Sequence, residues 1–99
     1  MKIIALLIGM LAASQSLAHE APKGWSYSTL CCSTTDCREV HPSAIGEGRL
    51  GYTIKRTGEL LGFFDKRLRD SPDGEFHWCS EAGRDDTKTI CLYIPPRGF

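Results

Sequence analysis

The chain has 99 residues with 12 Lys and Arg, 12 Asp and Glu, and a formal net charge of zero. That length allows one small domain, and the balanced charge excludes a nucleic-acid binder that works through bulk attraction to phosphates. With 24% charged and 41% hydrophobic residues, the composition also excludes a wholly disordered chain.

Residues 1–18 have the three parts of a signal peptide. Lys2 supplies a short positive start, residues 3–13 are apolar and uncharged, and Ser16 and Ala18 are small residues before a cleavage site. The apolar run is shorter than the roughly 20 residues of a membrane-spanning helix, and no second such run follows. We therefore expect export to the bacterial periplasm or medium. The mature chain, residues 19–99, is expected to be a single small β domain without a membrane span.

The mature chain shows short alternating runs between turn residues, the pattern of an antiparallel sheet. Residues 24–36 are expected to form a long ordered loop, and the charged run 65–70 a solvated connection or one helical turn. Residues 57–59 and 71–74 carry turn residues, the latter with Pro72 and Gly74. Strands are predicted over 38–41, 52–56, 60–64, 75–80 and 90–94. The expected fold is mainly β, a small disulfide-stapled antiparallel sheet with a long N-terminal loop.

The last two predicted strands each place a different set of side chains on either face. Phe76 and Trp78 share one face of the first strand, so His77 and Cys79 share the other. In the second strand, residues 90, 92 and 94 share a face, which leaves Cys91 and Tyr93 on the opposite one. A hairpin with the loop 80–89 would join the apolar sets in one layer and bring the His, Cys and Tyr side chains together on the other face.

All five cysteines lie in the mature chain, which in a small exported protein predicts disulfides. Bridges over long loops would stabilise the fold by about 3–4 kcal/mol each. We favour two bridges that link one of Cys31 and Cys32, together with Cys37, to Cys79 and Cys91. A local bridge between Cys79 and Cys91 is the alternative. Because five is odd, one of Cys31 and Cys32 is left over, and an unpaired thiol would allow a disulfide-linked dimer.

The order of these motifs resembles a family of small exported proteins of Gram-negative bacteria. The resemblance rests on three groups of residues: Cys31-Cys32 followed by Asp36-Cys37, then Ser71-Pro72-Asp73-Gly74 with Phe76, His77 and Cys79, and then Cys91-Leu92-Tyr93 with Pro95-Pro96. It covers nearly the whole mature chain. The family has no established activity, so the resemblance implies export and a common fold and assigns no catalytic or binding residue.

A copper or zinc site is the alternative to the disulfide framework. His77 and Cys79 share a strand face with Cys91 expected opposite, and thiolate and imidazole suit these metals. His19 offers a second possibility, because cleavage after Ala18 would give it a free amine beside its imidazole, with His41 or His77 completing the site. The oxidising compartment favours bridges over thiolates, so no metal or cofactor is the expected state.

Catalytic motifs are absent from the sequence. There is no G-x-S-x-G turn, no H-E-x-x-H helix, no phosphate-binding glycine loop and no C-x-x-C. A small thiol-dependent enzyme using His77 is the least favoured function. Acidic residues around the turn at 71–74 do not have the spacing of an EF-hand, and a solvated turn is expected there. These are Asp70, Asp73 and Glu75.

The function expected from the sequence is a non-enzymatic binding module for a protein or envelope partner. Its aromatic residues exceed what one hairpin layer needs to bury, so part of them are expected at an interface. We place that interface at Trp25 and Tyr27, with Phe63 and Phe64 equally suited to core or surface. Phe99 is a further aromatic outside the hairpin.

Overall fold

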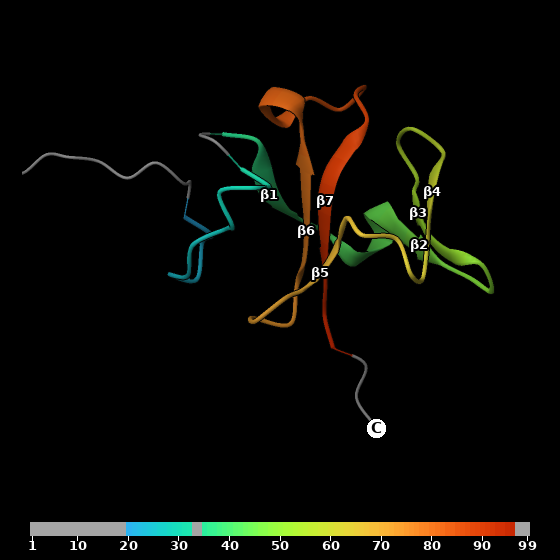
Figure 1. Cartoon of the computed structure of the whole chain (residues 1–99), viewed down its shortest axis with the longest axis horizontal. Coiled ribbons are helices and arrows are strands. Elements are labelled where there is room, and N and C mark those ends of the chain that lie inside the picture. The colour runs from blue at the N-terminus through green and yellow to red at the C-terminus, as the bar shows by residue number, and fades with distance from the viewer. Residues whose placement is uncertain (1–19, 33–34, 97–99) are drawn as a thin grey trace, which may run out of the picture.

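The computed structural model describes residues 20–32 and 35–96, whose strands form two sheets (Figure 1). The predicted signal peptide, His19 and Phe99 lie outside the described residues. In the four-stranded sheet the order is β1 (Cys37–Val40), β6 (Phe76–Ser80), β7 (Thr89–Ile94) and β5 (Leu68–Asp70). The three-stranded sheet consists of β2 (Ile45–Glu47), β3 (Gly51–Ile54) and β4 (Glu59–Gly62). Two short 3-10 turns, Pro42–Ala44 and Glu81–Gly83, complete the elements.

The mainly β fold with antiparallel hairpins is confirmed. All five predicted strands are present, with boundaries shifted by one or two residues: β1, β3, β4, β6 and β7. The strand β2 was not expected from the sequence, because glycines at 46 and 48 interrupt the alternation of apolar and polar residues that predicts a strand. It pairs antiparallel with β3, and β3 pairs with β4.

The expectation for residues 65–70 is wrong at their C-terminal end. Leu68–Asp70 forms β5, which pairs in parallel with β7, so that Leu68 lies opposite Leu92. A single apolar residue in a charged run carries no strand signal of its own. The strand exists because the backbone of β7 supplies partners on both flanks: Leu92 N donates to Arg67 O at 2.9 Å, and Ser71 N donates to Ile94 O at 2.8 Å.

The two faces of β6 and β7 belong to two apolar clusters. On one face the inter-sheet core joins this sheet to the three-stranded sheet through Ile45, Tyr52, Ile54, Leu61, Trp78 and Leu92. On the other face the N-terminal cluster joins it to the segment 20–32 through Ala21, Tyr27, Cys31, Cys32, Cys37, Cys79, Cys91 and Tyr93. In Figure 1 that segment and the three-stranded sheet accordingly lie on opposite sides of β6 and β7. The predicted division of the hairpin into two faces is thus correct.

Ile90 is the exception to this division. The register of β6 and β7 shifts between Cys79 and Ser80, because Cys79 lies opposite Cys91 whereas Ser80 lies opposite Thr89. Ile90 is the extra residue of this bulge, and a bulge turns its extra residue out of the regular alternation. As a result Ile90 packs against the N-terminal cluster and not with Leu92.

One disulfide attaches the N-terminal segment to the sheet, and a second joins β1 to β6 within it. Cys31 bonds to Cys91 across a sequence separation of 60, and Cys37 bonds to Cys79 across 42. This is the long-range arrangement favoured from the sequence, and Cys32 is the residue left over. The local alternative is wrong: Cys79 and Cys91 lie opposite each other in the register, yet each bonds to a cysteine of the N-terminal part.

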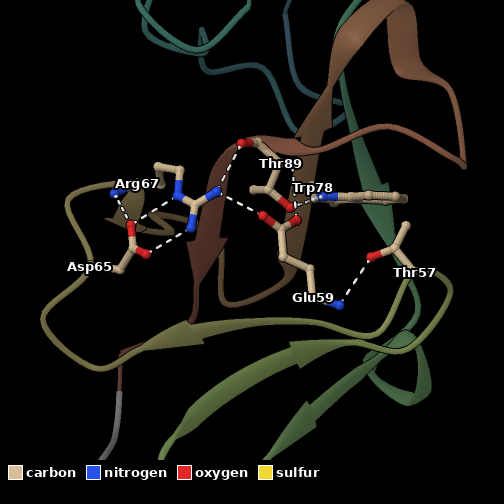
Figure 2. Close-up of polar contacts among 6 residues, drawn as sticks. All are labelled: Thr57, Glu59, Asp65, Arg67, Trp78 and Thr89. Atoms are coloured by element: carbon tan, nitrogen blue, oxygen red, sulfur yellow. Dashed lines mark hydrogen bonds and ion pairs between the residues drawn. The ribbon is translucent and has the colours of Figure 1, made fainter.

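The two sheets are also connected by a polar network around Arg67 (Figure 2). The Arg67 guanidinium donates to Asp65 Oδ2 and Glu59 Oε2, each at 2.8 Å, and to the carbonyl oxygen of Thr89 at 3.3 Å. Glu59 Oε1 in turn accepts from Thr89 N at 3.0 Å, and Trp78 Nε1 donates to Thr89 Oγ1 at 2.8 Å. The network therefore joins the first residue of β4 to the first residue of β7.

Within residues 20–32 and 35–96, no helix has the length and apolar character needed to cross a membrane.

Candidate functional site

A buried polar group, the imidazole of His77, lies on the same face of β6 as the N-terminal cluster. It comes from the second residue of β6 and is fully buried. The Tyr27 hydroxyl lies 2.9 Å from its Nδ1, and both oxygens of Asp73 lie 3.0 Å from its Nε2. Since an ionised carboxylate only accepts hydrogen bonds, Nε2 carries a hydrogen, and in the neutral imidazole Tyr27 donates to Nδ1. The three side chains thus form a chain Tyr27–His77–Asp73.

Asp73 receives more hydrogen bonds than its neighbours because the turn at 71–74 folds its carboxylate back against β6. Trp25 Nε1 donates to it at 2.8 Å, and Ser71 Oγ and the backbone N–H of Glu75 donate at 2.9 Å each. Burial by itself would raise the pKa of Asp73, but the hydrogen bonds from His77 and Trp25 outweigh it and hold that pKa far below its usual range. The solvated turn expected here is therefore wrong for Asp73, whose side chain is only 6% exposed.

Aromatic rings enclose this chain of hydrogen bonds. The Trp25 ring lies 4.9 Å from that of Tyr27, 5.0 Å from that of His77 and 5.2 Å from that of Tyr93, between ring centroids. Burial, followed by the charges of Cys32 and Asp73, raises the pKa of Tyr27 well above its usual value, so its hydroxyl stays protonated. Hydrogen bonds at both ring nitrogens hold the proton of His77 in a fixed place, and Tyr27 and His77 are both buried.

At the interface expected from the sequence, the structure buries Tyr27 and leaves Trp25 partly exposed. Tyr27 is buried, and Trp25 is partly buried with its indole N–H bonded to Asp73. Both residues face β6 and β7 because the bridge from Cys31 to Cys91 pulls their segment onto the sheet. Sequence alone suggested exposure, since residues 24–36 have no periodicity that would indicate a buried face.

The metal site proposed from His77, Cys79 and Cys91 is not formed. Both cysteines are in disulfides, and a disulfide sulfur offers no thiolate to a metal. His41 caps a 3-10 turn, where its Nδ1 accepts from the Ser43 N–H at 3.0 Å. His19 lies outside the described residues. The thiol of Cys32 is buried, so a disulfide-linked dimer through it would require this thiol to leave the core.

A different set of metal-binding side chains does come together. Glu39 in β1 lies directly opposite His77 in β6, and ligand atoms of Glu39, Asp73 and His77 are all within 4.8 Å of one another. Glu39 is exposed, whereas Asp73 and His77 lie behind it. Sequence reasoning missed Glu39 because only the register of β1 and β6 brings it to His77.

A second candidate site is the outer face of the three-stranded sheet. Gly46, Thr53 and Leu60 lie side by side in the register, on the face opposite to Ile54 and Leu61. Two exposed apolar side chains lie on this face, Leu50 (72%) and Leu60 (48%). Two more follow the end of β4: Phe64 (99%) and Phe63 (40%), whose ring lies 5.5 Å from that of Tyr52 in the inter-sheet core. We call these four residues the outer apolar surface.

A shallow groove of about 620 Å³ crosses this face, lined by Gly48, Arg49, Leu50, Gly51, Thr53 and Leu60. Gly51 is required beside it, because its φ is +148° and a Cβ there would overlap the backbone oxygen of Leu61. The sequence signal for this surface was the run 60–64, which has more large apolar residues than one face of a strand can bury.

Neither a protein-family model nor a curated protein nor a solved structure matches this chain. By its fold and disulfides, the chain belongs to the small, disulfide-stabilised proteins that are mainly β.

Proposed function

We propose that this protein is exported to the periplasm or medium and acts there as a non-enzymatic binding module for a protein or envelope partner. The observation that carries the proposal is the outer apolar surface, where Phe64 is 99% exposed and Leu50 72% exposed. Leu50 and Leu60 line a groove, and Phe63 and Phe64 follow directly after β4. Several large exposed apolar side chains in one part of a surface are typical of an interaction site, whereas single exposed ones are not informative.

The two disulfides support the proposed compartment. Disulfides form and persist in oxidising surroundings, and here one holds the segment 20–32 on β7 while the other joins β1 to β6. The signal-like residues 1–18 support the same location. Intact-mass measurement of the exported product should give a chain that begins at His19. A product that retains Met1 would contradict the proposed export.

The binding surface can be tested with a double variant, Leu50→Ser with Phe64→Ser. Both side chains are exposed, so the free energy of unfolding should change by no more than about 0.5 kcal/mol for each. Leu30→Ser is the matched control, because Leu30 is also exposed (76%) but belongs to the N-terminal segment.

We expect cross-linking in the periplasm to give the same adduct with the wild type and with the Leu30→Ser control, and to lose it with the double variant. If the double variant forms that adduct as well as the wild type does, the outer apolar surface is not the binding site.

A further inference from the structure

We infer that Glu39, Asp73 and His77 form a binding site for a divalent first-row transition metal ion such as Zn²⁺. Three ligand atoms, two carboxylate oxygens and one imidazole nitrogen, lie within 4.8 Å of one another. This inference is independent of the outer apolar surface, which lies on the other side of the four-stranded sheet. It also uses none of the cysteines.

Asp73 and His77 are about as far apart as two ligands of one ion, and an ion bound here would replace the hydrogen bond that now joins them. Neighbouring ligands of a zinc ion are roughly 3.0–3.5 Å apart, because each bond to the metal is about 2.0–2.2 Å long. Asp73 Oδ1 and His77 Nε2 are 3.0 Å apart, and so are Oδ2 and Nε2. Glu39 is the more distant ligand, but its exposed side chain is free to rotate toward the other two.

Both inner ligands are held in place by neighbours that a metal site needs. A histidine ligand binds through one ring nitrogen while a partner on the other nitrogen fixes the ring, and Tyr27 occupies that position on Nδ1 at 2.9 Å. When the ion binds Nε2, the hydrogen leaves Nε2 and one is taken up at Nδ1. The Tyr27 hydroxyl then accepts a hydrogen bond from Nδ1 instead of donating one to it. This change needs only a rotation of the hydroxyl hydrogen, while the oxygen stays in place.

Charge also favours a cation here. Asp73 is almost buried, and among the ion pairs of the described residues neither Asp73 nor Glu39 has a Lys or Arg partner. The two carboxylates therefore place negative charge beside His77 with only neutral donors and the imidazole near them, and such a pair attracts a cation. A divalent ion would balance their charge.

The kind of ion follows from the ligands. Imidazole suits zinc, copper, iron and nickel, whereas calcium and magnesium prefer oxygen ligands alone. Three protein ligands leave a coordination position open for water or for a group of a partner. Access to the ion would be from the side of Glu39, since His77 is fully buried.

The experiment uses the full oxidised chain and Zn²⁺ as the probe, with binding measured by titration calorimetry. The decisive variant is Glu39→Gln, which removes one charged ligand from the surface and leaves the core intact. Glu81→Gln is the matched control on the exposed 3-10 turn Glu81–Gly83. His19→Ala tests whether the N-terminus contributes.

We expect one Zn²⁺ per wild-type chain, at least tenfold weaker binding for Glu39→Gln, and unchanged binding for Glu81→Gln and His19→Ala. Mutating a residue that only hydrogen-bonds a metal ligand lowers metal affinity by about tenfold or more. Removing a ligand itself should lower the affinity further. Co²⁺ should also quench tryptophan fluorescence in the wild type, because the Trp25 ring is 5.0 Å from that of His77.

Results with the wild type and with either of two variants would overturn the inference. One such result is that the wild-type protein shows no saturable, one-to-one binding of Zn²⁺. Another is a Glu39→Gln variant that binds as tightly as the wild type, which would place any bound ion elsewhere. Asp73→Asn, checked for folding by circular dichroism, should likewise lose binding, and its unchanged affinity would count against the site in the same way.

Discussion

His77 is fully buried, and both nitrogens of its ring have hydrogen-bond partners. A buried polar side chain is tolerated only when its partners replace the water it has lost. Tyr27 and Asp73 meet that requirement from opposite sides of the ring, and they come from segments about 50 residues apart in the chain. The contact between Tyr27 and His77 therefore also orients the N-terminal segment on the sheet.

We predict that Tyr27→Phe lowers the free energy of unfolding by about 1–3 kcal/mol, because it leaves His77 Nδ1 buried without a donor. Urea unfolding followed by tryptophan fluorescence measures the change. Ser43→Ala is the control, since it removes an exposed hydroxyl 2.9 Å from a histidine nitrogen and should change stability by no more than about 0.5 kcal/mol. Equal stability of Tyr27→Phe and wild type would show that the buried hydrogen bond contributes nothing.

Asp65 supplies a prediction about pH. Hydrogen bonds from the side chain and backbone of Arg67 lower its pKa from 3.8 to about 2. A carboxyl whose pKa is lower in the folded state stabilises that state above its unfolded pKa, and the contribution disappears as the pH falls through the folded value. Wild type should therefore be more stable than Asp65→Asn above about pH 4, and the difference should shrink toward zero near pH 2.

Acid titration of unfolding free energies for both proteins measures this difference. Asp86→Asn is the control, because the Asp86 side chain is 74% exposed and should leave the acid profile close to that of the wild type. A gap between wild type and Asp65→Asn that stays constant down to pH 2 would contradict the assignment to Arg67.

At the scale of elements, the two sheets meet through an apolar core and one polar network. The apolar part is sealed by Trp78 and Leu92 from one sheet and by Tyr52, Ile54 and Leu61 from the other. Arg67 fixes how the two sheets are aligned, because its hydrogen bonds to Glu59 and Thr89 join the start of β4 to the start of β7 (Figure 2). Hydrophobic contact alone would leave that alignment less defined, because it has no preferred direction.

We predict that Arg67→Met lowers the free energy of unfolding by about 1–2 kcal/mol. Charged hydrogen bonds to Glu59 and Asp65 are lost, and their value is discounted because the Arg67 side chain is 34% exposed. Arg56→Met is the matched control: its ion pair with Asp85 is 3.4 Å long, its side chain is 68% exposed, and its loss should cost no more than about 0.5 kcal/mol. Thermal and urea unfolding compare the two. Equal effects would mean that the network does not hold the sheets together.

For the whole molecule, the disulfides restrict the unfolded chain more than any single contact does. Loops of 60 and 42 residues correspond to about 4 kcal/mol each when loop-closure entropy alone is counted. The bridge from Cys31 to Cys91 also keeps the segment 20–32 against β6 and β7, where it covers His77.

We predict that the double variant Cys31→Ala with Cys91→Ala loses about 2–5 kcal/mol of stability, measured by urea unfolding of the oxidised proteins. Tryptophan emission should also shift as Trp25 becomes exposed. Cys32→Ala is the control, and peptide mapping without reductant should find both bridges intact in it. A map of the wild type with Cys32 in a bridge would contradict the pairing.

The sequence by itself determined five of the seven strands and, apart from Ile90, the two faces of the hairpin. Alternation in 52–56 and 76–80 is local, so the pattern predicted β3 and β6 without knowledge of their neighbours. The disulfide arrangement was also within reach, because Cys31 and Cys32 are adjacent and cannot easily bridge each other, while Cys79 and Cys91 needed partners that would hold the N-terminal loop.

Tertiary structure decided which residues meet. Burial of Tyr27 and Trp25, the strand β5 and the approach of Glu39 to His77 all depend on pairings between segments far apart in the sequence. A local pattern records which face a residue occupies, but it does not record which segment covers that face. Position in the chain made Phe64 and Tyr27 look alike as spare aromatic residues. Only tertiary packing exposed the first and buried the second, because Phe64 lies beyond the end of β4 whereas Tyr27 belongs to a segment that a disulfide holds against β6 and β7.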